Sequence, residues 1–183
     1  MADPGPVLAA PVLAAPVLAT VVDTPIGPLS LLVLGGQLIA GGFTTQPVVM
    51  HARLAPPLRA LPLETAHPGD LPWLAKPVAA YFDGDLRALD GIPVCQPGPP
   101  PRQRLWAALR AVPPGTTVSY TRLAAQAGNP RAPRAAGAAC AYNLIAPVVP
   151  CHRALRSDGS LGGYYYGLDR KTWLLRHEGA RPR

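Results

Sequence analysis

A proline-rich segment at residues 93–101 constrains the fold of this chain more than any other feature. Proline has a fixed φ angle and no backbone N–H, so a run of prolines disrupts both helix interiors and central strands. The prolines of this segment are Pro93, Pro97, Pro99, Pro100 and Pro101. We therefore predict a linker at residues 93–101 that separates a domain at residues 20–92 from a domain at residues 102–183.

The net charge changes sign at the same boundary. Residues 1–100 carry four basic and seven acidic side chains, for a net charge of −3. Residues 101–183 carry thirteen basic and three acidic side chains, for a net charge of +10, and the whole chain has +7. The asymmetry favours a polyanionic partner such as nucleic acid for the C-terminal domain, although a solvated basic surface would have the same composition.

The first residues have low complexity. A pentad of the type Pro-Val-Leu-Ala-Ala repeats over residues 6–19, and a proline at every fifth position is incompatible with a regular helix, so we predict an extended tail at residues 1–19. Asp3 stands where a secretion signal would carry positive charge. No apolar stretch reaches the roughly 18–20 residues that span a bilayer. The odd number of cysteines, three, indicates a reducing compartment. We expect a protein that is neither secreted nor membrane-bound, in a bacterial-type cytoplasm or a nucleus.

The pattern of residues 20–92 predicts a small domain of sheet and helix. Apolar runs at residues 29–34 and 38–43 flank the pair Gly35-Gly36, which is typical of a β-hairpin. Residues 71–82 have apolar side chains at helical spacing. The fold class we predict is therefore α/β (α+β), with this domain preceding a helical one.

Residues 102–183 read as mainly helical. Helices are predicted at residues 102–112 and 121–127 and from Pro133 to about Tyr142, and the last two are joined by a Gly-containing turn. Two short helices with such a turn in a basic region are typical of a helix-turn-helix, here of the winged kind. The second of them carries one long side chain, Arg134, before a run of Ala and Gly. It either packs tightly against a neighbouring helix or enters a narrow groove.

The tetrapeptide Pro150-Cys151-His152-Arg153 is the strongest candidate for chemistry. An apolar run precedes it, and a turn rich in Gly and Tyr follows it. A nearby base or cation lowers the pKa of a thiol and makes it a nucleophile, so the Cys-His pair suggests an activated Cys151. A cysteine in apolar surroundings is more often inert core, and the pair alone does not decide between the two.

Several motifs in this half of the chain together resemble the O6-alkylguanine-DNA alkyltransferase family (methylated-DNA–protein-cysteine methyltransferases). They occur in the same order over about residues 102–179. The matching residues are Gly115 to Tyr120, Leu123-Ala124, Gly128-Asn129-Pro130, Arg134-Ala135, Asn143, Pro150 to Arg153, Asp158 to Tyr164, Lys171, and Leu174 to Gly179. Residues 24–27 and 79–84 match more loosely.

The resemblance implies DNA repair by direct reversal. The protein would bind duplex DNA containing O6-alkylguanine through the minor groove and flip out the damaged base. It would then transfer the alkyl group, such as methyl, to its own Cys151 in a single turnover. The resemblance implies double-stranded DNA as the partner, no cofactor, and action as a monomer.

The resemblance also assigns catalytic roles. His152 would serve as general base for Cys151 through a water, and Glu178 would orient and charge-stabilise His152. Asn143 would brace the turn that presents the nucleophile by bonding backbone groups. An ordinary helix C-cap is the structural alternative for Asn143.

Binding residues follow from the same resemblance. Arg134 would fill the gap that the flipped base leaves, and Tyr120 would crowd the target phosphate. The whole predicted DNA-binding set is Tyr120, Arg134, Ala135, Gly137 and Ala138. The predicted guanine pocket is formed by Tyr164, which would donate to guanine N3, with Leu161, Tyr165 and Lys171, the last supporting the Tyr-rich turn.

The chain departs from the family at three points. Pro101 stands where an aromatic residue is usual, which puts the packing there in doubt. Some members bind zinc in the N-terminal domain, but here Cys95, His51 and His67 are too few for a closed tetrahedral site, so we predict no metal. Tyr165 and Tyr166 replace small residues of some members, and we expect their rings to narrow the pocket and favour methyl over benzyl adducts.

Two other functions are compatible with parts of the sequence. A Cys-His hydrolase would turn over an ester continuously, although an adjacent Cys-His pair rarely has the required geometry. A helix-turn-helix protein that senses lesions without repairing them would bind DNA and leave the alkyl group in place. The presence of Cys151 favours repair over sensing.

Overall fold

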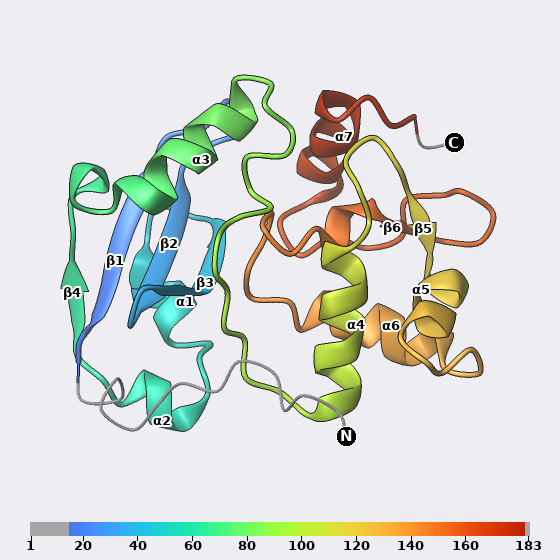
Figure 1. The fold of residues 1–183 in the computed structure, drawn as a ribbon, viewed down its shortest axis with the longest axis horizontal. Coiled ribbons are helices and arrows are strands. Elements are labelled where there is room, and N and C mark those ends of the chain that lie inside the picture. The colour runs from blue at the N-terminus through green and yellow to red at the C-terminus, as the bar shows by residue number, and fades with distance from the viewer. Residues whose placement is uncertain (1–14, 182–183) are drawn as a thin grey trace. The chain divides into compact units, whose positions relative to one another are not determined.

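The computed structural model describes residues 15–181 and contains two compact units (Figure 1). The first unit runs to Pro97 and takes back the later segment Leu144–Val148, and the second comprises Gly98–Asn143 and the residues from Val149 onwards. The pentad repeat predicted as a tail lies, up to residue 14, outside the described residues. Within residues 15–181 no helix has the length and apolar character needed to cross a membrane.

A four-stranded sheet forms the centre of the first unit. Its strands are β1 (Val17–Val22), β2 (Leu29–Leu34), β3 (Gln37–Phe43) and β4 (Leu63–Thr65), in the order β3-β2-β1-β4. β1, β2 and β3 pair antiparallel, and β4 pairs parallel to β1. The predicted hairpin is confirmed, because β2 and β3 are joined by Gly35 and Gly36, both at positive φ (56° and 74°).

The first strand begins earlier than the sequence predicts. Val17, Leu18 and Ala19 were assigned to the tail, but they pair with β4, and Leu18 and Ala19 also pair with β2, so this part of the tail prediction is wrong. Pro16 is the last proline of the repeat, so every later residue of β1 has an N–H to donate. The apolar side chains that read as low complexity are also what a buried strand requires, and Val17 is fully buried.

Helices cover the sheet on both faces. The helices of this unit are α1 (Pro47–His51), α2 (Pro56–Arg59), a 3₁₀ turn η2 (Pro68–Asp70) and α3 (Pro72–Phe82). α3 crosses the sheet in Figure 1 and buries Leu74, Val78 and Tyr81, as the periodicity predicts. Met50 of α1 and Leu58 of α2 join a second apolar cluster with residues of β1, β2 and β3. β2 is therefore buried along its whole length.

Two irregular segments cover the outer edge of β3. Cys95 N donates to Leu38 O at 3.0 Å, and Gly41 exchanges hydrogen bonds with Leu144 and Ala146. A Cβ at position 41 would lie 3.2 Å from Ala146 O, so glycine permits this close approach. The edge of the sheet is thus paired, and the segment that leads to the Cys-His tetrapeptide is anchored at residues 144–146.

The second unit is mainly helical. Its elements are α4 (Pro100–Arg110), β5 (Val118–Ser119), α5 (Tyr120–Gln126), α6 (Pro133–Ala141), a 3₁₀ turn η3 (Cys151–Arg153), β6 (Ala154–Leu155) and α7 (Leu168–His177). β5 and β6 pair in parallel. The predicted linker ends too late, because α4 starts at Pro100 and Pro101 belongs to its first turn. Proline is well tolerated there, since the first N–H groups of a helix have no intrahelical partner.

The pair α5–α6 is the predicted helix-turn-helix. Ser119 caps α5 by accepting from the Arg122 N–H at 3.1 Å. One side of α6 packs in the core, where Ala136 and Ala139 are buried and the Trp106 indole N–H donates to Ala139 O at 2.9 Å. Small side chains permit this close approach. Tight packing is thus confirmed for one side of α6. The opposite side remains exposed, and its entry into a narrow groove stays a prediction.

Candidate active site

Cys151 lies at the wall of a cavity of about 370 Å³ in the second unit. It opens the 3₁₀ turn η3, and its side chain is nearly buried. The cavity is lined by Tyr120, Gly137, Cys140, Ala141, Asn143, Cys151, Arg156, Gly162, Gly163, Tyr164, Tyr165 and Tyr166. Its size lies within the range of small-molecule pockets, about 300–1,000 Å³, so a thiol here faces space for a ligand.

Asn143 fixes the position of the thiol. Its buried side-chain amide donates to Val149 O at 2.8 Å and to Cys151 Sγ at 3.2 Å. The first bond joins Asn143 to the backbone of the segment before Cys151, as the family resemblance implies for this residue. The second, to the sulfur itself, was not predicted. A donor directed at Sγ stabilises the thiolate more than the thiol.

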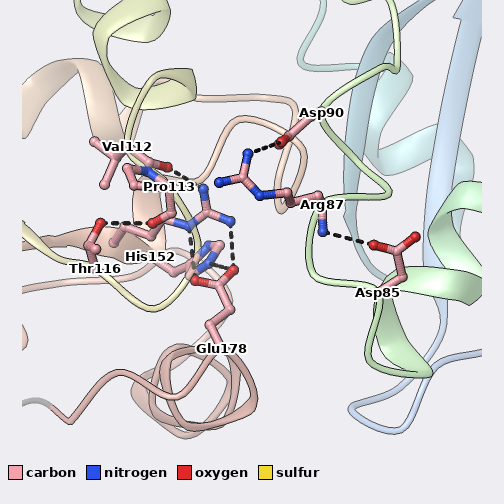
Figure 2. A network of polar contacts seen from close by, with 9 residues as sticks. Asp85, Arg87, Asp90, Val112, Pro113, Thr116, His152 and Glu178 are labelled. Carbon is pink, nitrogen blue, oxygen red and sulfur yellow. Dashed lines mark hydrogen bonds and ion pairs between the residues drawn. The ribbon is translucent and has the colours of Figure 1, made fainter.

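Behind the thiol, three charged or polar side chains form a buried cluster. His152 Nε2 lies 3.0 Å from Glu178 Oε1. Arg153 donates to the same carboxylate through Nε at 2.9 Å and through an Nη at 2.8 Å, and its other Nη donates to Val112 O. Figure 2 shows the Glu178 carboxylate directed at His152, below the backbone of Val112. The bidentate ion pair holds Glu178 in one orientation toward the imidazole.

This cluster sets the protonation state of His152. Burial, the largest effect, lowers the pKa of His152, while the Glu178 carboxylate opposes that shift. Hydrogen bonds and charge from His152 and Arg153 outweigh burial and lower the pKa of Glu178. At neutral pH we therefore assign a neutral imidazole and an ionised carboxylate. Since a carboxylate only accepts, Nε2 carries the proton, and Nδ1 is the basic nitrogen. Nδ1 is buried and accepts no hydrogen bond from residues 15–181.

The thiol itself is held in its protonated form. Burial raises the pKa of Cys151, and the Asn143 hydrogen bond and the charge of Lys171 offset part of that effect. The sequence suggests a thiolate near neutral pH, whereas the structure places a neutral thiol in the resting site. The thiolate must then form when its proton leaves, and the neutral His152 is the base nearest in sequence.

Lys171 lies under the turn that closes the cavity. Its fully buried ammonium donates to Ala154 O at 2.7 Å, to Leu161 O, and to Gly163 O at 3.5 Å. Burial lowers its pKa to about 8. These bonds hold the turn before the tyrosines, in line with the role that the family resemblance implies for Lys171.

A tight loop contacts the far end of this cluster. Gly115 has φ of +76°, and a Cβ there would lie 2.9 Å from Glu178 O. Thr116 Oγ1 donates to Pro113 O at 2.8 Å, which closes the loop (Figure 2). Both the positive φ and the close approach require glycine at position 115.

The predicted binding residues fall into two places. Tyr120 and Gly137 line the cavity, and Tyr120 is fixed against the closing turn, because a Cβ at Gly162 would lie 2.9 Å from its hydroxyl. Burial raises the pKa of Tyr120 to about 12, so it remains protonated. Arg134, Ala135 and Ala138 do not line the cavity and lie on the exposed face of α6.

The predicted guanine-pocket residues also separate. Tyr164 and Tyr165 line the cavity, together with Tyr166, whose ring contacts both of the others edge to face. The Leu161 side chain instead packs against a cluster of Leu155, Leu175 and Ala180, and only its carbonyl takes part through Lys171.

Three site residues with polar or charged side chains were missed from the sequence. Arg153 holds Glu178, while Cys140 and Arg156 line the cavity. Arg153 stands next to the Cys-His pair, and a basic residue followed by apolar Ala154-Leu155 is the one signal that could have indicated a buried ion pair. Among residues 15–181, no group of three or more His, Cys, Asp or Glu side chains is placed to hold a metal ion.

Comparison with known proteins gives matches to the half of the chain that contains this site. The family model "6-O-methylguanine DNA methyltransferase, DNA binding domain" matches residues 100–180. A methylated-DNA–protein-cysteine methyltransferase of Salmonella typhimurium is 48% identical over 106 residues, which are 58% of this chain and 62% of that protein. This chain thus spans less than two thirds of that relative.

Other relatives match over most of their length. The methylated-DNA–protein-cysteine methyltransferase of Mycolicibacterium paratuberculosis is 39% identical over 163 residues, 84% of this chain and 87% of that protein. A crystal structure of Mycobacterium tuberculosis OGT in complex with DNA superposes with a TM-score of 0.72 at 32% identity and covers 88% of this chain and 92% of that one. The active site unites the residues of the sequence motifs, and relatives of this identity match most of the chain. The chain therefore belongs to the methylated-DNA–protein-cysteine methyltransferase family.

Proposed function

We propose that this protein repairs duplex DNA by moving the alkyl group of an O6-alkylguanine onto Cys151, once per molecule. One observation carries the proposal: a cavity of about 370 Å³ is bounded by a cysteine whose sulfur accepts from Asn143 and whose neighbour is a neutral, carboxylate-held histidine. The crystallised Mycobacterium tuberculosis relative binds DNA, and the Salmonella and Mycolicibacterium relatives are named for transfer from methylated DNA to cysteine.

The chemical step follows from the protonation states. His152 Nδ1 accepts the Cys151 proton through a water, and the imidazolium that forms is stabilised by Glu178. The sulfur attacks the alkyl carbon, so the S–C bond forms as the bond from carbon to guanine O6 breaks. The departing guanine takes a proton at the ring, for which Tyr164 is the donor we propose. The His152 imidazolium then gives up its proton to water, and the Tyr164 phenolate regains one from water, so the thiol proton is in effect passed to guanine. Cys151 ends as a thioether, which has no proton to lose and no route back to the thiol.

The second unit supplies the DNA contact. Its residues from 101 onwards carry a net charge of +10, and α6 exposes Arg134 above a face of small side chains. Such a face permits close approach to a duplex groove, and the guanidinium of Arg134 would occupy the gap left by the extruded base. Extrusion puts guanine into the cavity beside Cys151, Tyr120 and Tyr164. We propose that the protein does this as a monomer and without a cofactor.

The proposal is tested by locating the transferred group. The protein is incubated with a duplex that carries one O6-methylguanine, digested, and its peptides weighed. We expect one added CH₂ on the Cys151 peptide and none in Cys151→Ala. Cys140→Ala is the matched control, because Cys140 lines the same cavity, and it should retain transfer. Modification of the Cys140 peptide instead would refute the assignment.

The same samples separate the two alternative functions. A hydrolase would continue to cleave an ester substrate after one equivalent of product, which the proposed single transfer forbids. A lesion sensor would bind the duplex and leave the methyl group on guanine. Both outcomes contradict the proposal.

A further inference from the structure

We propose that Arg156 binds a phosphate of the target nucleotide at the rim of the active-site cavity. This inference rests on the proposed function, since it places the alkylated base in that cavity. It adds a contact to the DNA backbone that does not come from the helix-turn-helix.

The backbone around Arg156 holds its side chain at the cavity. Arg156 directly follows β6, its N–H donates to Ser160 O at 2.9 Å, and its carbonyl accepts from the Gly159 N–H at 3.0 Å. The turn is thereby closed on both sides. Arg156 lines the cavity with Tyr120, Gly137 and Cys151, and it is exposed. A residue that both lines the cavity and is exposed is suited to keep an aliphatic stem against the wall and a charged end in solvent, and we infer this arrangement for Arg156.

Arg156 is available to an external anion. Among the described residues that line the cavity, it alone carries a positive charge, and its guanidinium makes no hydrogen bond or ion pair with any residue in 15–181. The other cations of the site differ: Arg153 and Lys171 are buried and bonded to a carboxylate or to carbonyls. The nearest carboxylate in the sequence, Asp158, interacts with Arg156 through charge alone. Its Oδ1 accepts hydrogen bonds from Ser160 N at 2.9 Å and Ser160 Oγ at 2.7 Å.

The chemistry of a flipped nucleotide explains what Arg156 would hold. When a base enters a pocket, its sugar and flanking phosphates remain at the entrance. O6-Methylguanine is neutral, so an exposed cation at the rim finds its charge partner in the phosphate. Guanidinium matches phosphate oxygens with two parallel hydrogen bonds, which also fixes the direction of the nucleotide. Gly137 and Tyr120 of the helix-turn-helix border the same cavity, so a strand bound to α6 passes this rim.

The experiment compares Arg156→Gln and Arg156→Lys with Arg176→Gln, a matched control on α7 that is exposed and does not line the cavity. In a Cys151→Ala background, duplex affinity is measured over a range of salt concentrations. In the reactive protein, the transfer rate is measured with the duplex and with free O6-methylguanine base. Thermal unfolding is recorded for each variant.

We expect Arg156→Gln to reduce the steepness of the log–log salt dependence of binding by about 0.9, the amount for one phosphate contact. Its transfer rate with duplex should fall about ten-fold, as for loss of one charge-assisted bidentate pair, and its rate with free base should stay unchanged. Arg156→Lys should restore the salt dependence, and Arg176→Gln should behave as wild type.

Two results would overturn the inference. An unchanged salt dependence in Arg156→Gln would show that no phosphate contact is made. Equal slowing with duplex and with free base would place Arg156 at the base instead of the backbone. The binding arm does not need alkyl transfer, so failure of the wild type to react would count against the proposed function alone.

Discussion

Replacing Glu178 by Gln should damage both stability and chemistry, because one carboxylate serves two buried partners. Its oxygens accept three hydrogen bonds, one from His152 and two from Arg153, at 2.8–3.0 Å. Glutamine keeps the shape but replaces one acceptor by an NH₂ donor. Whichever way the amide is placed, it directs an N–H at a group that is itself a donor, and Arg153 keeps a buried charge without a counter-ion.

The magnitude follows from that loss. Removing one partner of a buried ion pair costs about 3–5 kcal/mol, and the isosteric amide, which keeps one or two bonds, places Glu178→Gln near the lower end at about 3 kcal/mol. For a chain of this size each kcal/mol lowers Tm by about 2–4 °C, so the expected decrease is about 6–12 °C. His152 also loses the group that fixes its tautomer, and transfer should slow by about 10²–10⁴-fold.

The assay pairs calorimetric unfolding with single-turnover transfer from an O6-methylguanine duplex. Glu64→Gln is the matched control, because it makes the same chemical change at an exposed position on β4, away from the site. A Glu178→Gln protein with the Tm and the transfer rate of Glu64→Gln would refute the reasoning about the buried cluster.

Four further predictions follow from single features of the site. Asn143→Ala should lower the unfolding free energy measured in urea by about 1–3 kcal/mol, because Val149 O loses its buried donor. The same change should raise the pKa of Cys151 further, because Sγ loses its donor, and this should slow alkylation of the thiol at fixed pH. A thiol as reactive as in the wild type would contradict the role of Asn143. Gly115→Ala should lower the unfolding free energy by about 1–2 kcal/mol or more, because alanine is strained at the left-handed φ and its Cβ would press on Glu178 O. An unchanged denaturation midpoint would count against that contact. The unfolding free energy should fall as pH decreases below 6.5, because His152 binds a proton in the unfolded state more readily than in the folded state. It should fall again below pH 4.5, because Glu178 also binds a proton more readily when unfolded. An unfolding free energy that stays constant from pH 7 to 4 would contradict this prediction. Tyr165→Ala should increase the rate of reaction with benzylguanine relative to methylguanine, because it widens the cavity that Tyr165 lines. An unchanged ratio of the two rates would show that Tyr165 does not determine selectivity.

Local patterns predicted the elements that depend on local physics. The hairpin around Gly35-Gly36, the buried stripe of α3 and the helix-turn-helix were confirmed, because turn residues and apolar periodicity determine them. The boundaries failed where two local tendencies compete. Pro100 and Pro101 read as linker but start α4, and Val17 to Ala19 read as repeat but pair in β1.

What the sequence missed is long-range. The parallel pairing of β4 with β1 and the return of Leu144–Val148 to the edge of β3 depend on contacts between distant segments, which periodicity does not encode. In the site, Glu178 and His152 were paired through the family resemblance. The role of Arg153 required coordinates, because the apolar residues that follow it indicate burial without identifying Glu178 as its partner. The division of the chain into two domains remains a prediction, with the linker ending before Pro100. The roles of the binding residues also remain predictions.

The central claim is a single, irreversible transfer to Cys151, and a stoichiometric titration tests it most directly. A fixed amount of protein is mixed with increasing excess of a duplex that carries one radiolabelled O6-methylguanine, and label bound to protein is counted to completion. The account predicts a plateau at one methyl group per molecule, all of it on Cys151 and none in Cys151→Ala. A plateau that keeps rising with excess duplex, or label retained by Cys151→Ala, would contradict it.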